Sequence, residues 1–367
     1  MISSLLYLSI LALNLVRYTD ALDPRVKLAF TIDRPSQGSS ITPDGKRIFL
    51  QLVTFDDSTG PGLVERQANG SLTAYPNEAW DSWTEGDDPT TAFVSVAAQR
   101  IGPDGQFWVI DNGYGSDGVI PEGAKVVTFN LTTNQRTRTY PFGNLTHSAS
   151  LLDDIRFNGN EAYLTDAGVG SIIALDLVTG HGRRLLENQP ATVGYMATSS
   201  EGYLMRNSTN GLHFIQADQL EVSPDGKWLH FQTTAGGMSR IATKYLHNAL
   251  HNHSIADTDL ALNVKPFAPT SCTGSTATDS EGVMYASDTN HLNIMKILPN
   301  GTMTTFIHDP SLVWVDGMLL DGQKRLWLPA AQFNRAPEWH NGTNEIRKPI
   351  HIYTVDIENG PASLDHA

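Results

Sequence analysis

The chain has 367 residues, of which 40% are hydrophobic, and a formal net charge of −14. The hydrophobic fraction suffices for a packed core, while the charge argues against nucleic acid or an anionic membrane as a partner. Cys272 is the single cysteine, so an internal disulfide is excluded and the fold must hold by packing. We expect Cys272 to be a small buried hydrophobe, with a reactive thiol at a channel mouth as the alternative.

The first 21 residues predict a secretory signal peptide. Their apolar run over residues 5–16 is too short to span a bilayer, and Thr19 and Ala21 frame a small-x-small cleavage site. A buried N-terminal strand is the alternative. Localisation outside the cell or in the secretory-pathway lumen, without a membrane span in the mature chain, agrees with the Asn-x-Ser/Thr glycosylation sequons. These lie at Asn69, Asn130, Asn144, Asn207, Asn252, Asn300 and Asn341.

A short strand at residues 26–32 opens the mature chain. It alternates apolar and polar residues, and we expect it to pair with residues 351–357, which would close a ring of sheets and remove two open edges. Residues 54–92 follow without clear strand signals. We expect them either to cover one end of a central channel or simply to pack on the surface.

A repeated hairpin organises the rest of the chain. In residues 101–111 (IGPDGQFWVID) a Pro-Asp-Gly turn separates two strands, and Gly105 supplies the positive φ that closes the turn. Such repeats are typical of propellers. We therefore predict an all-β fold, a six-bladed β-propeller of four-stranded antiparallel blades over residues 22–360, with a frayed tail at 361–367. Six unrelated hairpins in a β-sandwich are the alternative. The turn glycines are Gly45, Gly105, Gly159, Gly226, Gly282 and Gly322.

Polar residues at strand ends predict the site. In a propeller the innermost strand of each blade begins beside the end of the second strand, so these residues should gather at one mouth of the channel. Neighbouring carboxylates there would raise at least one pKa and create an acid–base pair. The alternative is that each aspartate caps its own turn. The predicted catalytic residues are Asp153, Asp316 and, as a general base, His147, which is otherwise a solvated loop histidine. The predicted ligand-binding residues are Asp111, Asn112, Asp166, Asp288, Asn290, Trp314 and Trp80.

Two further patterns carry less weight. His247 and His251 are four residues apart on the expected helix 243–251, and His253 follows, which is metal-ligand spacing. However, a glycan on the sequon at Asn252 would put this cluster in solvent, so the sequence disfavours a metal there. Residues 113–118 fit G-x-G-x-x-G, but Pro121 and a glycine interrupt any following helix, so a dinucleotide loop is excluded.

Several segments resemble the major royal jelly/Yellow family. Residues 93–97 (FVSVA) with 105–113 (GQFWVIDNG) resemble its "VSVYRV … DxLWVLDTG" signature, and residues 162–166 (AYLTD) resemble "AYISD". The single cysteine departs from the insect members and indicates a fungal or microbial relative. The resemblance implies a six-bladed propeller with an axial ligand cavity. Family roles include binding of biogenic amines and conversion of dopachrome-like quinonoid intermediates, and fungal relatives are associated with secondary metabolism.

A weaker likeness leads to the senescence-marker/gluconolactonase propellers, which hold a divalent cation on the axis. Residues 315–318 (VDGM) are similar to their "PDGM" segment. The likeness implies Asp316 and Asp153 as ligands of a possible calcium ion, with Gln37 near a third position and Ala97 at a position that offers no oxygen. Calcium wants six to eight oxygens, so no cofactor is favoured.

Together these patterns predict a secreted propeller that binds a small hydrophobic or aromatic molecule on its axis. As an enzyme it would be a cofactor-independent isomerase or cyclase that tautomerises or cyclises a quinonoid intermediate. A metal-dependent lactonase and a non-catalytic amine-binding protein are the alternatives. The sequence leaves the oligomeric state open.

Overall fold

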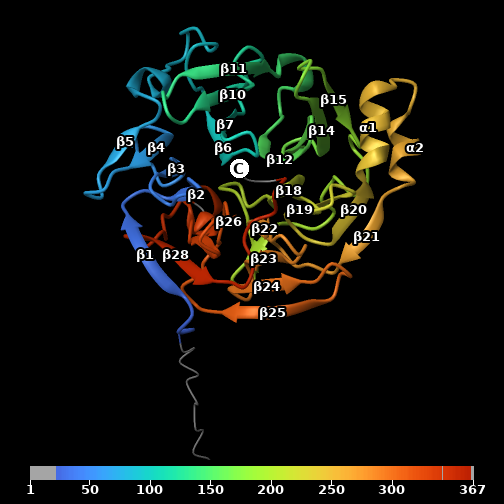
Figure 1. The fold of residues 1–367 in the computed structure, drawn as a ribbon. Helices are drawn as coiled ribbons and strands as arrows, with labels where there is room; N and C mark the ends of the chain where they lie inside the picture. Colours follow the sequence, from blue (N-terminus) through green and yellow to red (C-terminus); the bar gives the residue numbers. More distant parts are fainter. Residues whose placement is uncertain (1–21, 341, 365–367) are drawn as a thin grey trace, which may run out of the picture.

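The structure is a computed structural model that describes residues 22–340 and 342–364, so the predicted signal peptide and the sequon at Asn341 lie outside the described residues. The described chain forms six four-stranded antiparallel sheets arranged around a central axis (Figure 1). The predicted six-bladed β-propeller is therefore confirmed.

The blades are numbered here by the chain order of their innermost strands, and their strands are given from the axis outward. Blade 1 contains β2 (Ser36–Ile41), β3 (Ile48–Leu52), β4 (Leu63–Arg66) and β5 (Leu72–Ala74). Blade 2 contains β6 (Val96–Ile101), β7 (Gln106–Asp111), β10 (Lys125–Asn130) and β11 (Arg136–Pro141). Blade 3 contains β12 (Leu152–Asn158), β13 (Glu161–Asp166), β14 (Ser171–Asp176) and β15 (Gly182–Leu185).

Blade 4 contains β18 (Ala217–Val222), β19 (Trp228–Thr233), β20 (Met238–Ala242) and β21 (Lys265–Ala268). Blade 5 contains β22 (Thr276–Thr278), β23 (Met284–Asp288), β24 (Asn293–Ile297) and β25 (Met303–His308). Blade 6 contains β26 (Leu319–Leu320), β27 (Arg325–Pro329), β28 (Ile350–Asp356) and β1 (Lys27–Ile32). The connections hold two small hairpins and four 3-10 turns, namely β8 (Tyr114–Gly115) with β9 (Gly118–Val119), β16 (Ser199–Ser200) with β17 (Tyr203–Leu204), and η1 (Glu78–Asp81), η2 (Gly143–Leu145), η3 (Phe333–Arg335) and η4 (Pro337–Trp339).

The ring closes within blade 6, where the first strand of the chain joins the last. β1 pairs antiparallel with β28, with Thr31 opposite His351 and Lys27 opposite Thr354. This confirms the expected pairing of the two terminal segments. Because the blade takes strands from both ends of the chain, the sheet edges that an open ring would expose are removed.

The alternation of side chains along β7 explains how neighbouring blades hold together. Phe107 and Val109 belong to the buried cluster shared with blade 1, whereas Trp108 and Ile110 belong to the one shared with blade 3. Successive side chains of a strand point to opposite faces, so a blade packed on both faces needs apolar residues at both sets of positions. Gly105 makes the preceding turn with φ +72°.

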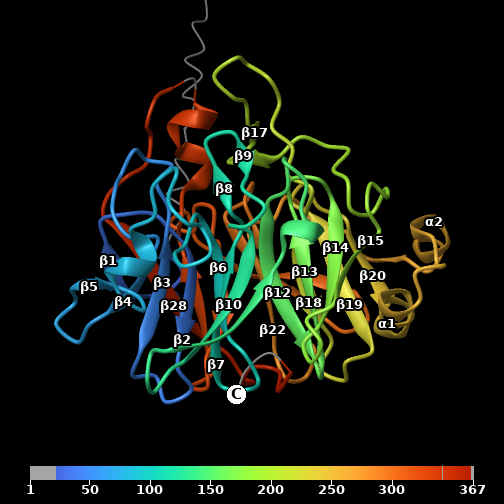
Figure 2. The same ribbon diagram turned by 90° about the horizontal axis from the view of Figure 1, so that it is seen from above.

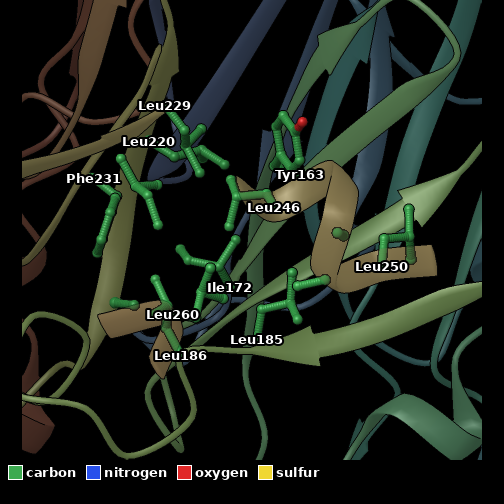
Figure 3. Close-up of a cluster of buried hydrophobic side chains, with 14 of the residues drawn as sticks. Tyr163, Ile172, Leu185, Leu186, Leu220, Leu229, Phe231, Leu246, Leu250 and Leu260 are labelled. Atoms are coloured by element: carbon green, nitrogen blue, oxygen red, sulfur yellow. The ribbon is translucent and has the colours of Figure 1, made fainter. Parts of the chain in front are cut away.

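Two helices fill the outer rim between blades 3 and 4. α1 (Thr243–His251) and α2 (Asp257–Ala261) are inserted between β20 and β21 and lie at the edge of the ring (Figure 1). Leu246 and Leu250 of α1 pack into the buried cluster with Tyr163 and Ile172 of blade 3 (Figure 3). The helix expected at residues 243–251 is present. No helix in the described ranges has the length and apolar character needed to cross a membrane.

The described C-terminal residues, up to residue 364, lie at the end of the propeller opposite β8, β9 and β17 (Figure 2). Pro361 bridges to Asp279, Ala362 is 2% exposed, and Leu364 packs against buried residues of blades 3 and 4. The sequence predicted a frayed tail for residues 361–367. Residues 361–364 are instead packed against the blades, because the apolar side chains of Ala362 and Leu364 pack there. Residues 365–367 lie outside the described residues.

Candidate functional site

A cavity of about 680 Å³ opens on the propeller axis. Its walls come from the innermost strands of several blades and from residues 54–92, which contribute Phe55, Asp81 and Trp83. This segment showed no clear strand signals in the sequence, but it contains β4 and β5 of blade 1. Parts of the segment thus border the cavity, and its predicted role as a cover over one end of the channel stays a prediction. Cavities of a few hundred Å³ with apolar walls and few convergent polar groups are typical of small-molecule sites.

β-bulges place polar side chains at the start of the innermost strands. The register shifts between Leu152 and Ile155 in β12 and between Ala217 and Leu220 in β18. Bulges re-aim side chains that a regular strand would send into the blade interface. The bulged residues Asp153 and Asp154 in blade 3, and Asp218 and Gln219 in blade 4, therefore line the cavity. Corresponding shifts in β2 and β6 place Gln37 and Ala97 there.

Three carboxyl groups, Asp153, Asp218 and Asp316, interact across the cavity floor. Burial raises the pKa of Asp316 to about 8, and the negative charge of Asp218 adds to the shift. Burial also raises the pKa of Asp218 to about 6, opposed by hydrogen bonds from Thr234 and Asp153. The pKa of Asp153 lies well above its usual value because of burial and then the Asp218 charge. Asp153 therefore carries the proton that it shares with the Asp218 carboxylate.

Asp316 is held by donors on both oxygens. Its Oδ2 accepts Nε1 of Trp314 at 3.1 Å and Nε2 of Gln37 at 3.2 Å, and its Oδ1 accepts the Gly317 amide at 2.8 Å. Trp314 has φ +48°, in the left-handed region that a bulky residue rarely adopts. Such strained backbone concentrates at functional sites, where the surrounding structure holds it in place. Here it directs the indole N–H at the carboxyl group.

Asp154 lies next to Asp153 in the same bulge, but its pKa is shifted in the opposite direction. Although burial opposes ionisation, the guanidinium groups of Arg156 and Arg100 lower its pKa. Arg156 also donates to Glu221 of blade 4 at 2.7 Å, so charges alternate along three innermost strands. Two adjacent aspartates thus differ in protonation because only one of them has arginine partners.

An aromatic wall borders the carboxyl groups. The ring of Trp314 lies 5.2 Å from that of Phe333, which lies 5.3 Å from that of Phe55. All three line the cavity. Trp339 extends this cluster away from the cavity and stacks on His213 at 3.7 Å. Such a surface can hold a planar ligand against its face.

The cavity also contains buried polar atoms without a protein partner. Both side-chain heteroatoms of Gln99, and one oxygen each of Gln51, Gln219 and Ser39, lack hydrogen-bond partners within the described part of the chain. Leaving a buried polar group unpaired costs about 1–3 kcal/mol. These atoms can therefore pair with polar groups of a bound molecule or with water.

The predicted site residues separate into two groups. Asp153, Asp316, Trp314 and Asn112 line the cavity, and the first three meet at its floor. The cavity lining found in the described residues does not include the other six predicted residues. These are His147, Asp111, Asp166, Asp288, Asn290 and Trp80.

Three of the strand-end aspartates fix turns or pair with bases. Asp111 accepts Nζ of Lys125 at 2.6 Å in a fully buried pair, and Asp166 accepts Arg184 at 2.8 Å together with backbone amides. Asp288 accepts amides of its own turn and His291 at 2.8 Å. The turn-capping alternative describes these contacts, and a ligand-binding role for these three residues stays a prediction.

The remaining predicted residues also have other contacts. His147 is exposed and lies 3.0 Å from Glu187, outside the cavity lining. Trp80, in the segment 54–92, packs against the ring of Phe93. Asn290 donates to Ser199 Oγ at 2.9 Å. Their predicted roles likewise stay predictions.

Sequence reasoning missed Asp218 and Asp154. A signal for Asp218 was present, because residues 217–220 (ADQL) repeat the apolar-Asp-polar-apolar pattern of residues 152–155 (LDDI) at the start of the next blade. Asp154 followed Asp153 directly and could not be distinguished from it without the bulge. Cys272, 3% exposed, is the buried residue that was favoured, and burial raises the pKa of its thiol.

The fold defines a six-bladed propeller with a polar cavity on its axis. The profile of the major royal jelly protein family matches residues 94–359. The chain belongs to this family. A search of the curated proteins found no match.

Solved structures with the same fold include metal-binding and lactone-hydrolysing propellers. The calcium-binding protein regucalcin from Agrobacterium tumefaciens is 12% identical at a TM-score of 0.53, with 92% of this chain and 97% of that one covered. A gluconolactonase from Xanthomonas campestris is 10% identical at 0.52, with 90% and 89% covered. A luciferin-regenerating enzyme is 11% identical at 0.56, with 93% and 98% covered. Identities this low establish a shared fold alone.

The axial residues do not fit a calcium ion well. Asp153, Asp218, Asp316 and Gln37 offer oxygens, but Ala97 offers none, and calcium takes six to eight oxygens. Within the described residues, one group of three His or Glu side chains has ligand atoms within 4.8 Å of one another. It consists of Glu161, His247 and His251 and lies outside the cavity lining. The axial carboxyl groups do not form such a group.

Proposed function

We propose that this protein binds a small planar molecule in the axial cavity and moves a proton on it without a cofactor, as an isomerase or cyclase of quinonoid intermediates. One observation carries the proposal: Asp316 and the Asp153–Asp218 pair form an acid–base set beside the aromatic wall. Pairs of carboxyl groups whose environments push their pKa values apart can act as acid and base at one pH.

The pKa values support a division of roles between the carboxyl groups. Near pH 7, Asp316 with a pKa of about 8 is mostly protonated, whereas Asp218 with a pKa of about 6 is mostly ionised. Asp218 would accept a proton from an acidic carbon of the ligand, and Asp316 would donate one to its carbonyl oxygen. The ligand is tautomerised with no change in oxidation state. Asp153, which is hydrogen-bonded to Asp218, can pass the proton on when the site resets.

The cavity supplies orientation and shielding from water. A ligand ring lying on Trp314 and Phe333 would present its oxygens to the carboxyl groups and to the unpaired amide of Gln99. Holding a reacting molecule in one geometry removes much of the entropic barrier of ring closure. This combination suits a ligand with an aromatic face and a polar edge.

The test is tautomerisation of dopachrome, a quinonoid probe, followed by its visible absorbance. We expect Asp316→Asn to lower kcat by roughly 10²–10⁴-fold, the range for loss of a general acid or base. Asp259→Asn, which removes the same charge from an exposed position on α2, should leave kcat unchanged. Equal rates for the wild-type protein and Asp316→Asn would refute the assignment.

A non-catalytic amine-binding role is the second candidate. The ionised Asp218 places a negative charge in the cavity that favours a cationic ligand. Dopamine binding by calorimetry, weakened in Asp218→Asn and unaccompanied by any turnover of dopachrome, would favour this role over the isomerase. A lactonase would require an axial ion, and the misfit described above gives it less support.

We further propose that the chain is exported and glycosylated. The sequons at Asn69, Asn144, Asn252 and Asn300 are exposed, as a glycan requires. A mass decrease of protein from the culture medium after enzymatic deglycosylation tests this proposal.

A further inference from the structure

A cluster of three potential metal ligands lies where α1 meets blade 3, and none of the three lines the axial cavity. It consists of Glu161, at the start of β13 in blade 3, and His247 and His251 of α1 in blade 4. The structure brings one ligand atom from each residue within 4.8 Å of the others. The two histidines are four residues apart and so share one helix face. His253, which completed the spacing in the sequence, does not belong to the cluster.

We propose that this cluster is a binding site for a divalent transition metal, with zinc as the expected ion. Two imidazole nitrogens and one carboxylate oxygen are the ligand set of many three-residue zinc sites. Glu161 Oε1 lies 2.5 Å from His247 Nδ1 and 3.5 Å from His251 Nε2. Tetrahedral zinc with bonds of 2.0–2.1 Å separates its ligand atoms by about 3.3 Å. The Glu161–His251 separation is therefore close to that of a zinc complex, and the Glu161–His247 contact would open by about 0.8 Å.

The surrounding contacts hold the carboxylate in place. The hydroxyl of Tyr163, a buried residue, donates to the other oxygen of Glu161 at 3.0 Å. Such contacts orient a metal ligand and raise its affinity for the ion. Asp176 lies directly opposite Glu161 in the β13–β14 ladder, and its carboxylate interacts electrostatically with His251. Asp176 adds negative charge beside the site, which favours a cation.

The helix is anchored so that the histidines face blade 3. Leu246 and Leu250, which directly precede the two histidines in α1, are fully buried against blades 3 and 4 (Figure 3). Arg183 of blade 3 donates to the carbonyl oxygens of Ala249 and Asn252 at the end of the helix. The histidine side chains remain 58% and 45% exposed, which leaves room for water as a fourth ligand. A bound ion would link α1 to blade 3.

The test is titration of the full-length protein, first dialysed against chelator, with Co²⁺ and with Zn²⁺. We expect one equivalent of Co²⁺ to produce the visible absorption of a tetrahedral complex, and Zn²⁺ to displace it and raise the Tm. Replacing both His247 and His251 by alanine should weaken binding at least ~100-fold. Tyr163→Phe should weaken it by roughly 10-fold, because the ligand residues stay but their orientation is lost.

Two variants serve as controls. His253→Ala removes a neighbouring histidine outside the cluster, and Asp316→Asn alters the axial carboxyl groups, so both should bind like the wild-type protein. Absence of binding in the wild-type protein would overturn the proposal. Binding that survives loss of both His247 and His251, or that disappears equally in His253→Ala or Asp316→Asn, would overturn it as well.

Discussion

Asp316→Asn should make the protein more stable at neutral pH, although the residue lies at the centre of the candidate site. Burial and the negative charge of Asp218 raise the pKa of Asp316 to about 8. The folded protein therefore opposes ionisation of this group, while the unfolded chain does not. Asparagine occupies the same volume and never ionises, so the variant avoids this cost.

The size of the effect follows from the two pKa values. In the unfolded chain an aspartate titrates near 3.9, so between about pH 4 and pH 8 the folded state holds a proton that the unfolded state releases. Stability is thus lost as the pH rises through this window, by at most about 1.4 kcal/mol per pH unit. At pH 7 the accumulated cost is at most about 4 kcal/mol, and water in the cavity reduces it. Asparagine also weakens the bond from Trp314 Nε1, which is worth about 1 kcal/mol.

The assay is urea unfolding of the wild-type protein and Asp316→Asn at pH 5, 6 and 7, followed by tryptophan fluorescence. The stability of the variant relative to the wild-type protein should rise steadily with pH, by up to about 2.7 kcal/mol between pH 5 and 7. Asp259→Asn should show no such trend, because this aspartate is exposed. A difference between wild type and Asp316→Asn that stays constant over this range would refute the elevated pKa.

Two further predictions concern stability. Lys125→Met should lower the free energy of unfolding in urea by about 3–5 kcal/mol, because it leaves the buried Asp111 carboxylate without its partner. Lys27→Met breaks an exposed pair with Asp356 and should cost less than about 1 kcal/mol. Equal losses in the two variants would contradict this account. Deleting residues 361–367 should lower the Tm, because the packing of Ala362 and Leu364 against the blades is lost. Deleting residues 365–367 alone is the control. An unchanged Tm after the longer deletion would show that the packed tail adds no stability.

The sequence predicted the repeat architecture well because its signals are local. A turn such as 103–105 needs proline, aspartate and a glycine with positive φ. The same Pro-Asp-Gly turn recurs at 43–45 and 224–226, and the turns of the other blades are variants that keep the glycine. Alternating apolar residues then identify each second strand. The pairing of β1 with β28 was also predicted from the sequence, since an unpaired strand at each end of a repeat protein requires a partner.

Only part of the candidate site was predicted from the sequence. Asp153, Asp316 and Trp314 were predicted, and they meet at the cavity floor. Asp111 was an equally good candidate by position, but Lys125, fourteen residues away, takes up its carboxylate in a buried ion pair. Strand position identifies where an aspartate lies, whereas its ionisation depends on which charges the fold brings next to it.

The sequence by itself determined the number of blades and their turns, because each depends on residues that are neighbours in the chain. It also identified the two closing strands, because each shows its own alternating pattern and the two ends of a ring need each other as partners. Only the tertiary structure decided that Asp218 joins Asp153, that Asp154 pairs with Arg156, and that Glu161 meets two histidines of α1. These contacts join different blades or depend on a β-bulge. Electrostatic interactions act through space over a few ångströms, so residues distant in sequence decide which carboxyl group is an acid, a base or a potential metal ligand.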